Sequence, residues 1–315
     1  MVGWKDIPNQ IRIVQGKGMD INPINITTGI FERKNYYTLI NAYKELFTIP
    51  GSNPTSYVSG ISIQEVFSIY NFDFDLRLMY LKNILRIEAE LRTHIAYEFG
   101  KIYSGIGWTN ASSFDSTNSY VPQLINDLND IVSKGVRKNK EMFTHFTSQG
   151  KIVPIWVLIE NLEFGTLRSF YNCLNQRLRE TIARTYYNLS ESVLRNFIAY
   201  LNEIRNVCAH DNRLLFFKCK YKINNMPLHH NLGITLNSSG SYIRGKKDCF
   251  VLLIVMKYLL DDKDFKDSFY QIKQLFVKLK RNLKVICLKD ILDSLGYPDS
   301  TNSHIGWKNI LETSK

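Results

Sequence analysis

The sequence predicts a mainly α-helical protein, and three observations support this fold class. The 315-residue chain has only eight prolines, which leaves long stretches without the residue that interrupts helices. Apolar residues recur at steps of three and four over 76–99 and 193–204, the spacing that forms one apolar helical face. Hydrophobic residues make up 44% of the chain and charged residues 22%, values typical of a folded protein with a core.

The N-terminal part, residues 1–55, predicts an extension that precedes the main fold. Glycine and proline punctuate its first 30 residues, and the apolar pattern that follows predicts a helix over 31–47. Pro50 and Gly51 are expected to end this helix, and residues 56–62 predict short strands or loops.

The longest helix is expected to begin after Asp73, a suitable N-cap, and to end at Phe99, before Gly100. At 1.5 Å per residue, its roughly 26 residues span about 39 Å. A helix of this length is expected to be a central element of the fold.

Other segments show helical spacing and are separated by polar or glycine-containing stretches. They cover about 121–133, 154–165, 167–174, 191–204, 247–261 and 264–283, and 205–210 is either the end of the fourth of these helices or the turn just beyond it. Residues 101–120 predict a loop, and 214–248 loses the helical period around the turn signal Asn237-Ser238-Ser239-Gly240, so we predict a small β-hairpin insertion there. We expect one domain over 1–315, with the extension, a helical core over 56–290 and a tail over 291–315.

The charge balance indicates the class of partner. Lys and Arg number 40 against 29 Asp and Glu, a net charge of +11, which favours nucleic acid first and an anionic membrane surface second. The five cysteines form no C-x-x-C pair, which favours reduced thiols of a cytoplasmic protein over disulfides or a metal site. We expect no signal peptide, no cofactor and no membrane span, since the apolar run 249–260 is too short to cross a bilayer.

The run Arg205-Asn206-Val207-Cys208-Ala209-His210 carries the candidate catalytic pair, Arg205 and His210. A neutral His can take the proton of a ribose 2′-OH, whose oxygen then attacks the adjacent phosphorus, while Arg stabilises charge on the phosphate. On an ideal helix the two positions lie about 140° apart, so a frayed last turn or a second copy of the helix must bring them together. The spacing alone also fits a His that caps a helix end beside a solvated Arg.

Several segments, in order along the chain, resemble one protein family. The run 205–214 resembles the signature of Abi-like proteins of the AbiD/AbiF type, bacterial abortive-infection proteins of the HEPN superfamily. Segments 70–77 and 86–93 resemble the second block of that family. Shorter similar segments are Lys17-Gly18-Met19, Asn35-Tyr36-Tyr37, Pro154-Ile155-Trp156, Phe164-Gly165 and Leu295-Gly296-Tyr297-Pro298. The chain departs from the family at Lys17, where Arg is usual, and at Asp211, where His is frequent.

The resemblance implies a HEPN-like helical bundle that cleaves RNA without a metal ion. It implies that Arg205 and His210 are catalytic, that Asn206 orients the site or the substrate, and that the products carry a 2′,3′-cyclic phosphate and a free 5′-OH. It also implies a homodimer with a composite site. Some relatives are toxins restrained by a small noncoding RNA, so an RNA partner of that kind is expected here.

Charged residues near these segments are candidates for RNA binding, namely Arg213, Glu88, Arg92, Lys218, Lys220 and Lys222. Glu88 and Arg92 either face the catalytic cleft or form an i,i+4 ion pair worth about 0.3–0.5 kcal/mol. The lysines of 218–222 lie among aromatic residues that could stack on bases. Each basic patch also fits an ordinary solvated surface.

The function predicted from these residues is an endoribonuclease toxin of phage defence. A non-catalytic HEPN-type RNA-binding protein, in which the same pair grips a phosphate, is the first alternative. An interaction protein whose helical face docks onto a phage component is the second.

Overall fold

The computed structural model describes residues 3–210, 212–298 and 306–313. Within these ranges the chain is mainly helical and contains no β-strand, only three isolated β-bridges. The predicted fold class is therefore confirmed. No helix in the described ranges combines the length and the apolar character that a membrane crossing requires.

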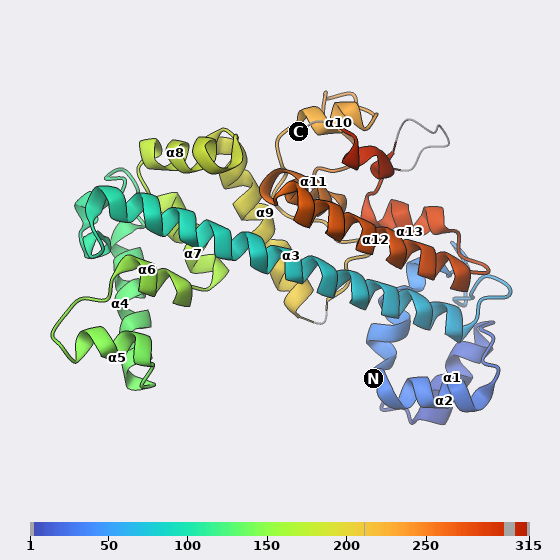
Figure 1. Cartoon of the computed structure of the whole chain (residues 1–315). Coiled ribbons are helices and arrows are strands. Elements are labelled where there is room, and N and C mark those ends of the chain that lie inside the picture. Colours follow the sequence, from blue (N-terminus) through green and yellow to red (C-terminus); the bar gives the residue numbers. More distant parts are fainter. Residues whose placement is uncertain (1–2, 211, 299–305, 314–315) are drawn as a thin grey trace.

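The fold is organised along one helix, α3 (Ile63–Tyr103), which runs diagonally through the whole molecule in Figure 1. Its 41 residues correspond to roughly 60 Å at 1.5 Å per residue. Ser62 caps it, accepting a hydrogen bond from the Glu65 N–H at 3.2 Å. The predicted limits at Asp73 and Gly100 were wrong, because both residues lie inside the helix.

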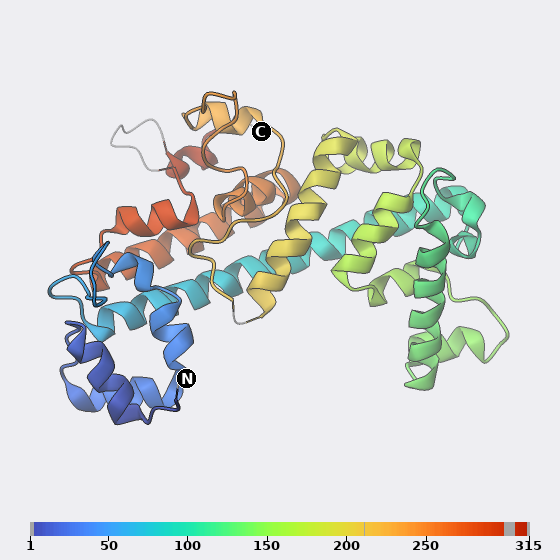
Figure 2. The same cartoon turned by 180° about the vertical axis from the view of Figure 1, so that it is seen from behind.

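The other helices pack along this spine in three groups, as Figures 1 and 2 show from opposite sides. The N-terminal group holds α1 (Ile7–Gly16) and α2 (Ile24–Arg33). The far end of α3 carries α4 (Val121–Arg137), α5 (Glu141–Thr147), α6 (Ile155–Leu158), α7 (Phe164–Cys173) and α8 (Gln176–Tyr187). The remaining group comprises α9 (Glu191–Ala209), which crosses α3, and α10 (Pro227–Asn231), α11 (Phe250–Leu259), α12 (Asp262–Asn282) and α13 (Leu288–Leu295).

The helix predicted over 31–47 is broken in the structure. After α2, Lys34 adopts an extended conformation, a π-helical turn covers Tyr37–Asn41, and a short 3₁₀ turn covers Lys44–Leu46. The side chain of Asn35 accepts a hydrogen bond from the Tyr37 N–H at 2.8 Å. This local bond offers the backbone an alternative to helix, which explains the break.

The β-hairpin predicted within 214–248 is not formed by any residue of that range, all of which the structure describes. The turn at 237–240 is present, but the chain on either side pairs only at one antiparallel bridge, Leu236 with Tyr242. His229 explains the irregular path: its ring is buried, its Nδ1 accepts from the Met226 N–H at 3.0 Å, and its Nε2 lies 2.6 Å from the Gly245 carbonyl. Burial lowers the pKa of His229, so it holds these segments as a neutral ring.

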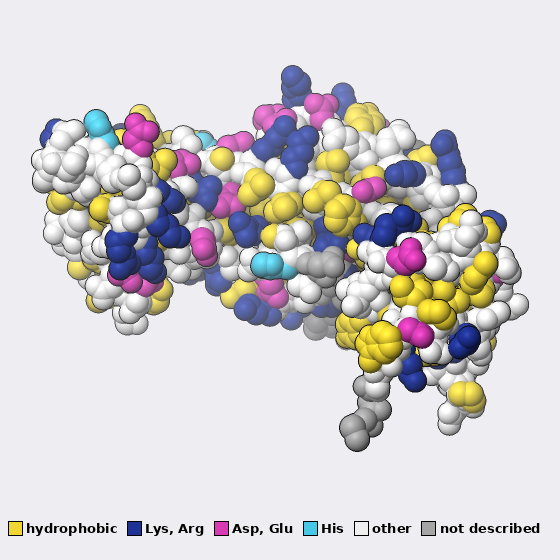
Figure 3. All heavy atoms as spheres, turned by 90° about the horizontal axis from the view of Figure 1, so that it is seen from below, with side chains coloured by type: hydrophobic (Ala, Val, Ile, Leu, Met, Phe, Trp, Pro, Cys, Tyr) yellow, Lys and Arg dark blue, Asp and Glu magenta, His cyan; other side chains and the backbone are white. Residues whose placement is uncertain are grey.

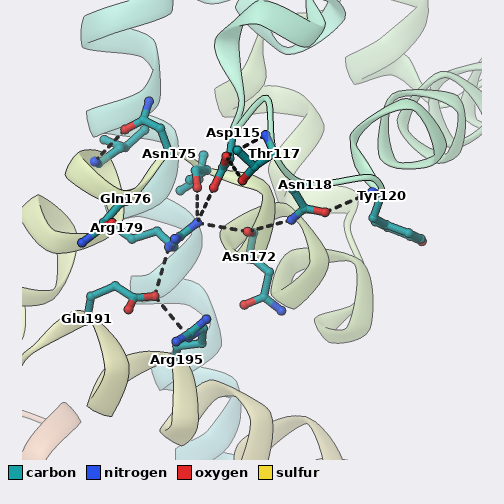
Figure 4. Close-up of polar contacts among 12 residues, drawn as sticks. Asp115, Thr117, Asn118, Tyr120, Asn172, Asn175, Gln176, Arg179, Glu191 and Arg195 are labelled. Atoms are coloured by element: carbon teal, nitrogen blue, oxygen red, sulfur yellow. Dashed lines mark hydrogen bonds and ion pairs between the residues drawn. The ribbon is translucent and has the colours of Figure 1, made fainter.

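The break expected at Gly165 lies earlier, at 162–163, and Gly165 is in the first turn of α7. The loop before α4 is attached to α7, α8 and α9 through Arg179 (Figure 4). Its guanidinium contacts the Glu191 carboxylate at 3.0 Å, the Asn172 carbonyl at 3.1 Å and the Asp115 carboxylate at 3.9 Å. A single cation therefore joins the three segments.

The C-terminal helices are bound to α3 by buried polar contacts. Ser268 of α12 donates to Asn83 at 2.7 Å, and the hydroxyls of Tyr80 and Tyr297 contact each other. Glu65, which is 2% exposed, accepts the backbone N–H groups of 284, 285 and 286 through one carboxylate oxygen, at 3.0, 3.0 and 2.8 Å. Tyr297 and Trp307 are buried, so the described part of the predicted tail packs on the core.

Candidate functional site

The helix that carries the Arg–His run is fixed by its apolar face. Ser190 accepts from the Val193 N–H at 3.4 Å and so caps α9. The side chains of Leu194, Phe197, Leu201 and Ile204 are fully buried. The helix is buried on all sides over 197–201, whereas Asn206, Ala209 and His210 at its C-terminal end are exposed.

His210 lies where α9 ends. Its backbone is extended (φ −100°, ψ 163°), although its N–H still bonds the Asn206 carbonyl at 3.0 Å. Its own carbonyl accepts hydrogen bonds from the Asn212 N–H at 2.7 Å and from Arg77 Nη1 at 2.9 Å. The residue is exposed, so its imidazole is accessible while its backbone is held.

The anchor of this helix end is the pair Asp73 and Arg77 on α3. Arg77 Nε lies 3.5 Å from one Asp73 oxygen, and the other oxygen accepts the N–H groups of Leu214 and Leu215 at 3.0 and 3.1 Å. Burial raises the pKa of Asp73 to about 6, against the opposite effects of these hydrogen bonds and of Arg77. Tyr43 of the N-terminal extension also hydrogen-bonds this carboxyl. One buried carboxyl therefore joins the spine, the extension and the chain that follows His210.

The other members of the run occupy different environments. Arg205 is half-buried on the last turns of α9, and its Nε is buried without a hydrogen-bond partner among the described residues. Asn206 is exposed. Cys208 faces inward, and burial raises the pKa of its thiol to about 12, which leaves it protonated and a poor nucleophile. The polar side of the run thus consists of Arg205, Asn206 and His210.

Arg213 lies directly beside the run. Its Nη2 contacts the Glu45 carboxylate at 3.2 Å, and its guanidinium stands over the Phe216 ring at 5.1 Å. It lines a cavity of about 210 Å³ together with Arg77 and residues of the extension. The other lining residues are Tyr37, Thr38, Asn41, Ala42, Tyr43, Tyr70 and Asn212. Sequence reasoning missed this contribution of the extension, although its cluster of tyrosines was a signal.

Glu88 and Arg92 are placed away from solvent. Arg92 Nη2 contacts the Glu88 carboxylate and also donates to the Leu162 carbonyl at 2.7 Å. The Arg92 side chain is 14% exposed and the Glu88 side chain 3%. This geometry matches the i,i+4 ion pair. The pair fixes the chain before α7 to α3.

Lys218, Lys220 and Lys222 are exposed along an extended segment beside α9. The Lys220 N–H bonds the Glu203 carboxylate at 3.2 Å, and Asn196 donates to the Lys222 carbonyl at 3.0 Å. Their backbone is thus attached to two turns of α9, and the three lysines are exposed at alternate positions. The segment forms a row of cations that leads along α9 from the region of the run.

Among the described residues, no three His, Cys, Asp or Glu side chains lie close enough together to hold a metal ion. Four of the five cysteines are buried, and all five are free thiols.

Comparison with known proteins gives one match. A family model described as Abi-like protein matches residues 29–215. The matched region begins in α2, contains all of α3 and α9, and ends at Leu215, whose N–H is bound by Asp73. No curated protein and no solved structure matches the chain.

Proposed function

Because the chain belongs to the Abi-like protein family, we propose that it is an endoribonuclease of bacterial phage defence, with Arg205 and His210 as its catalytic residues. The observation that carries this proposal is the position of His210. His210 is exposed at the end of α9, and its carbonyl is held by the buried Arg77. Five residues earlier lies Arg205, whose Nε has no hydrogen-bond partner within the described part of the chain. A general base needs both access to substrate and a fixed position.

The proposed reaction is transfer of the phosphodiester from the 5′-oxygen to the ribose 2′-oxygen. His210 takes the proton of the 2′-OH, and the new 2′-O–P bond forms as the P–O5′ bond breaks. The 5′-oxygen leaves and takes up a proton from solvent, and the His210 imidazolium returns its proton to solvent. The Arg205 guanidinium binds the non-bridging phosphate oxygens, where negative charge increases in the transition state. The products are a 2′,3′-cyclic phosphate and a 5′-OH, and the protein groups alone supply this chemistry.

Asn206 is proposed to orient the substrate, since it is exposed one helical turn before His210. A second copy of α9 would place two Arg205–His210 pairs along one groove, so a homodimer is proposed as the active form. RNA is the proposed substrate, and a small noncoding RNA is the proposed restraining partner. The net charge of +11 supports a polyanionic partner.

The test is incubation of the purified full-length protein with a mixture of RNAs in EDTA. We expect cleavage by the wild type, and a loss of at least 100-fold for His210→Ala and Arg205→Ala, roughly the size of general-base and oxyanion effects. His145→Ala, on the distant α5, is the matched control and should cleave normally.

The alternative is a non-catalytic RNA-binding protein. Intact RNA in the presence of a protein that binds it, with binding weakened by Arg205→Ala, would support that alternative. Cleavage that persists unchanged in His210→Ala would contradict the nuclease site proposed here.

A further inference from the structure

A groove in the N-terminal extension continues from the cavity beside His210. The 210 Å³ cavity shares Tyr37 and Asn41 with a larger one of about 900 Å³. The larger cavity is lined by α1, α2 and the segment between Gly3 and Lys5. The two cavities therefore adjoin at Tyr37 and Asn41, and we call them together the extension groove.

Both aromatic rings and cations line the extension groove. Tyr37 is 69% exposed and lies where the two cavities join, and Trp4 at the outer end is 88% exposed. Lys34 lines the outer cavity while its ammonium stands 4.8 Å from the Tyr70 ring of the inner one. The remaining cations of the lining are Lys5, Arg33, Arg77 and Arg213. Figure 3 shows hydrophobic side chains and Lys or Arg side chains together on this end of the molecule.

The balance of charge in the extension groove favours an anion. Against five cations, the lining contains one carboxylate, Glu32, and Glu45 lies just outside and contacts Arg213. Exposed planar rings among cations are the pattern by which proteins bind single-stranded nucleic acid, with bases stacked on rings and phosphates held by Lys and Arg. A duplex would not present free base faces to these rings.

The inner cavity is held in place by the contacts that position His210. Tyr43 hydrogen-bonds the Asp73 carboxyl, and Arg77 donates a hydrogen bond to the His210 carbonyl. Arg213 directly precedes the two residues whose N–H groups Asp73 accepts. A nucleotide in this cavity is therefore at a fixed position relative to the proposed cleavage site.

We propose that the extension groove binds single-stranded RNA, with a base stacked on Tyr37 and phosphates contacted by Lys34 and Arg213. This inference rests on the proposed function, because the RNA strand is expected to run into the groove from the nucleotide that is cleaved at His210. The N-terminal extension then selects unpaired RNA. It also determines the length of single-stranded RNA that is needed on one side of the cleaved bond.

The experiment measures binding of a fluorescein-labelled oligouridine of about 15 nucleotides by anisotropy, in full-length His210→Ala protein so that no cleavage occurs. Tyr37→Leu in this background should weaken binding about 10-fold, and Tyr37→Phe, which keeps the ring, should bind normally. Tyr97→Leu is the matched control, because Tyr97 is 63% exposed on the distant part of α3. Lys34→Gln and Arg213→Gln should each reduce the slope of log K against log salt by roughly 0.7.

Two results separate this inference from the nuclease proposal. If the groove variants lose binding but no preparation cleaves RNA, the groove stands and the nuclease assignment fails. If the wild type cleaves RNA while Tyr37→Leu binds and cleaves like Tyr97→Leu, the groove is not an RNA site. Equal binding of a double-stranded oligonucleotide of the same length, or no binding of the single strand, would also overturn the inference.

Discussion

Arg77 Nη1 donates a hydrogen bond of 2.9 Å to the carbonyl oxygen of His210, and this contact joins the middle of the spine helix to the end of α9. The two residues are 133 positions apart in the sequence. Arg77 is 5% exposed and pairs with Asp73, so the contact is made from inside the core. Arg77 acts as a positioning residue, because it fixes the backbone of His210 and not its ring.

Replacement of Arg77 by lysine should reduce turnover more than binding. A single ammonium cannot contact both Asp73 and the His210 carbonyl as the forked guanidinium does. A shift of the imidazole by about 1 Å costs roughly 10- to 100-fold in rate. We expect kcat for RNA cleavage to fall by that factor in Arg77→Lys while KM changes less than about threefold. A change confined to KM would contradict the positioning role.

Asp73 predicts a pH dependence of stability. Its pKa is raised from 3.8 to about 6 by burial, so the native state holds a proton that the unfolded state releases. The contribution of a group with a raised pKa is complete below the unfolded value and is lost as the pH rises through the folded value. Relative to Asp73→Asn, the wild type should therefore lose on the order of 3 kcal/mol of unfolding free energy between pH 4 and pH 7. Urea unfolding of both proteins at several pH values measures this, and a pH-independent difference would refute it.

Substitution of Glu65, which lies outside the candidate site, should have a large effect on the stability of the fold. One of its oxygens accepts three consecutive backbone N–H groups, and removing it leaves these donors buried and unpaired. Glu65→Ala should lower the unfolding free energy by about 3 kcal/mol or more, and Glu65→Gln, which keeps the acceptor, should lower it less. The exposed Glu160→Ala serves as control and should stay within about 0.5 kcal/mol of the wild type.

Removal of the Arg179 side chain should lower the stability of the fold without lowering the rate of RNA cleavage per folded molecule. Its side chain is 11% exposed and joins three segments (Figure 4), whereas Arg195 contacts the same Glu191 from a position that is 52% exposed. Arg179→Ala should cost about 2–4 kcal/mol, and Arg195→Ala less than about 1 kcal/mol. Below the melting temperature, cleavage per folded molecule should be equal in both variants. A specific loss of cleavage in Arg179→Ala would show that this network influences the site.

Local signals in the sequence predicted most helices, and failed where the partner of a residue is distant. The apolar face over 193–204 predicted α9, which spans Glu191–Ala209, because a periodic face is a local feature. Asp73 was interpreted as a cap because aspartate is a preferred N-cap residue. Its actual partners, the N–H groups of Leu214 and Leu215, are 141 and 142 residues away. No property of the neighbouring sequence indicates such a bond.

In the candidate site too, the sequence indicated the local features and did not indicate those that depend on contacts between distant segments. The Arg205–His210 run and Arg213 were visible in the sequence, because their chemistry is carried by residue type and spacing. The cavity beside them was not, since it depends on the π-helical turn at Tyr37–Asn41 packing next to α3. Glu88 and Arg92 had two interpretations in the sequence, and only their burial and the bond to Leu162 distinguish between them.

The most direct test of the account is the chemistry of the ends that the protein leaves on a defined RNA. His210 acting on the 2′-OH predicts a 2′,3′-cyclic phosphate on one fragment and a 5′-OH on the other, detectable by mass spectrometry. An RNA with a 2′-O-methyl group at the cleaved position should resist cutting there. Fragments with a 5′-phosphate and a 3′-OH, or normal cutting of the methylated RNA, would contradict the proposed role of His210.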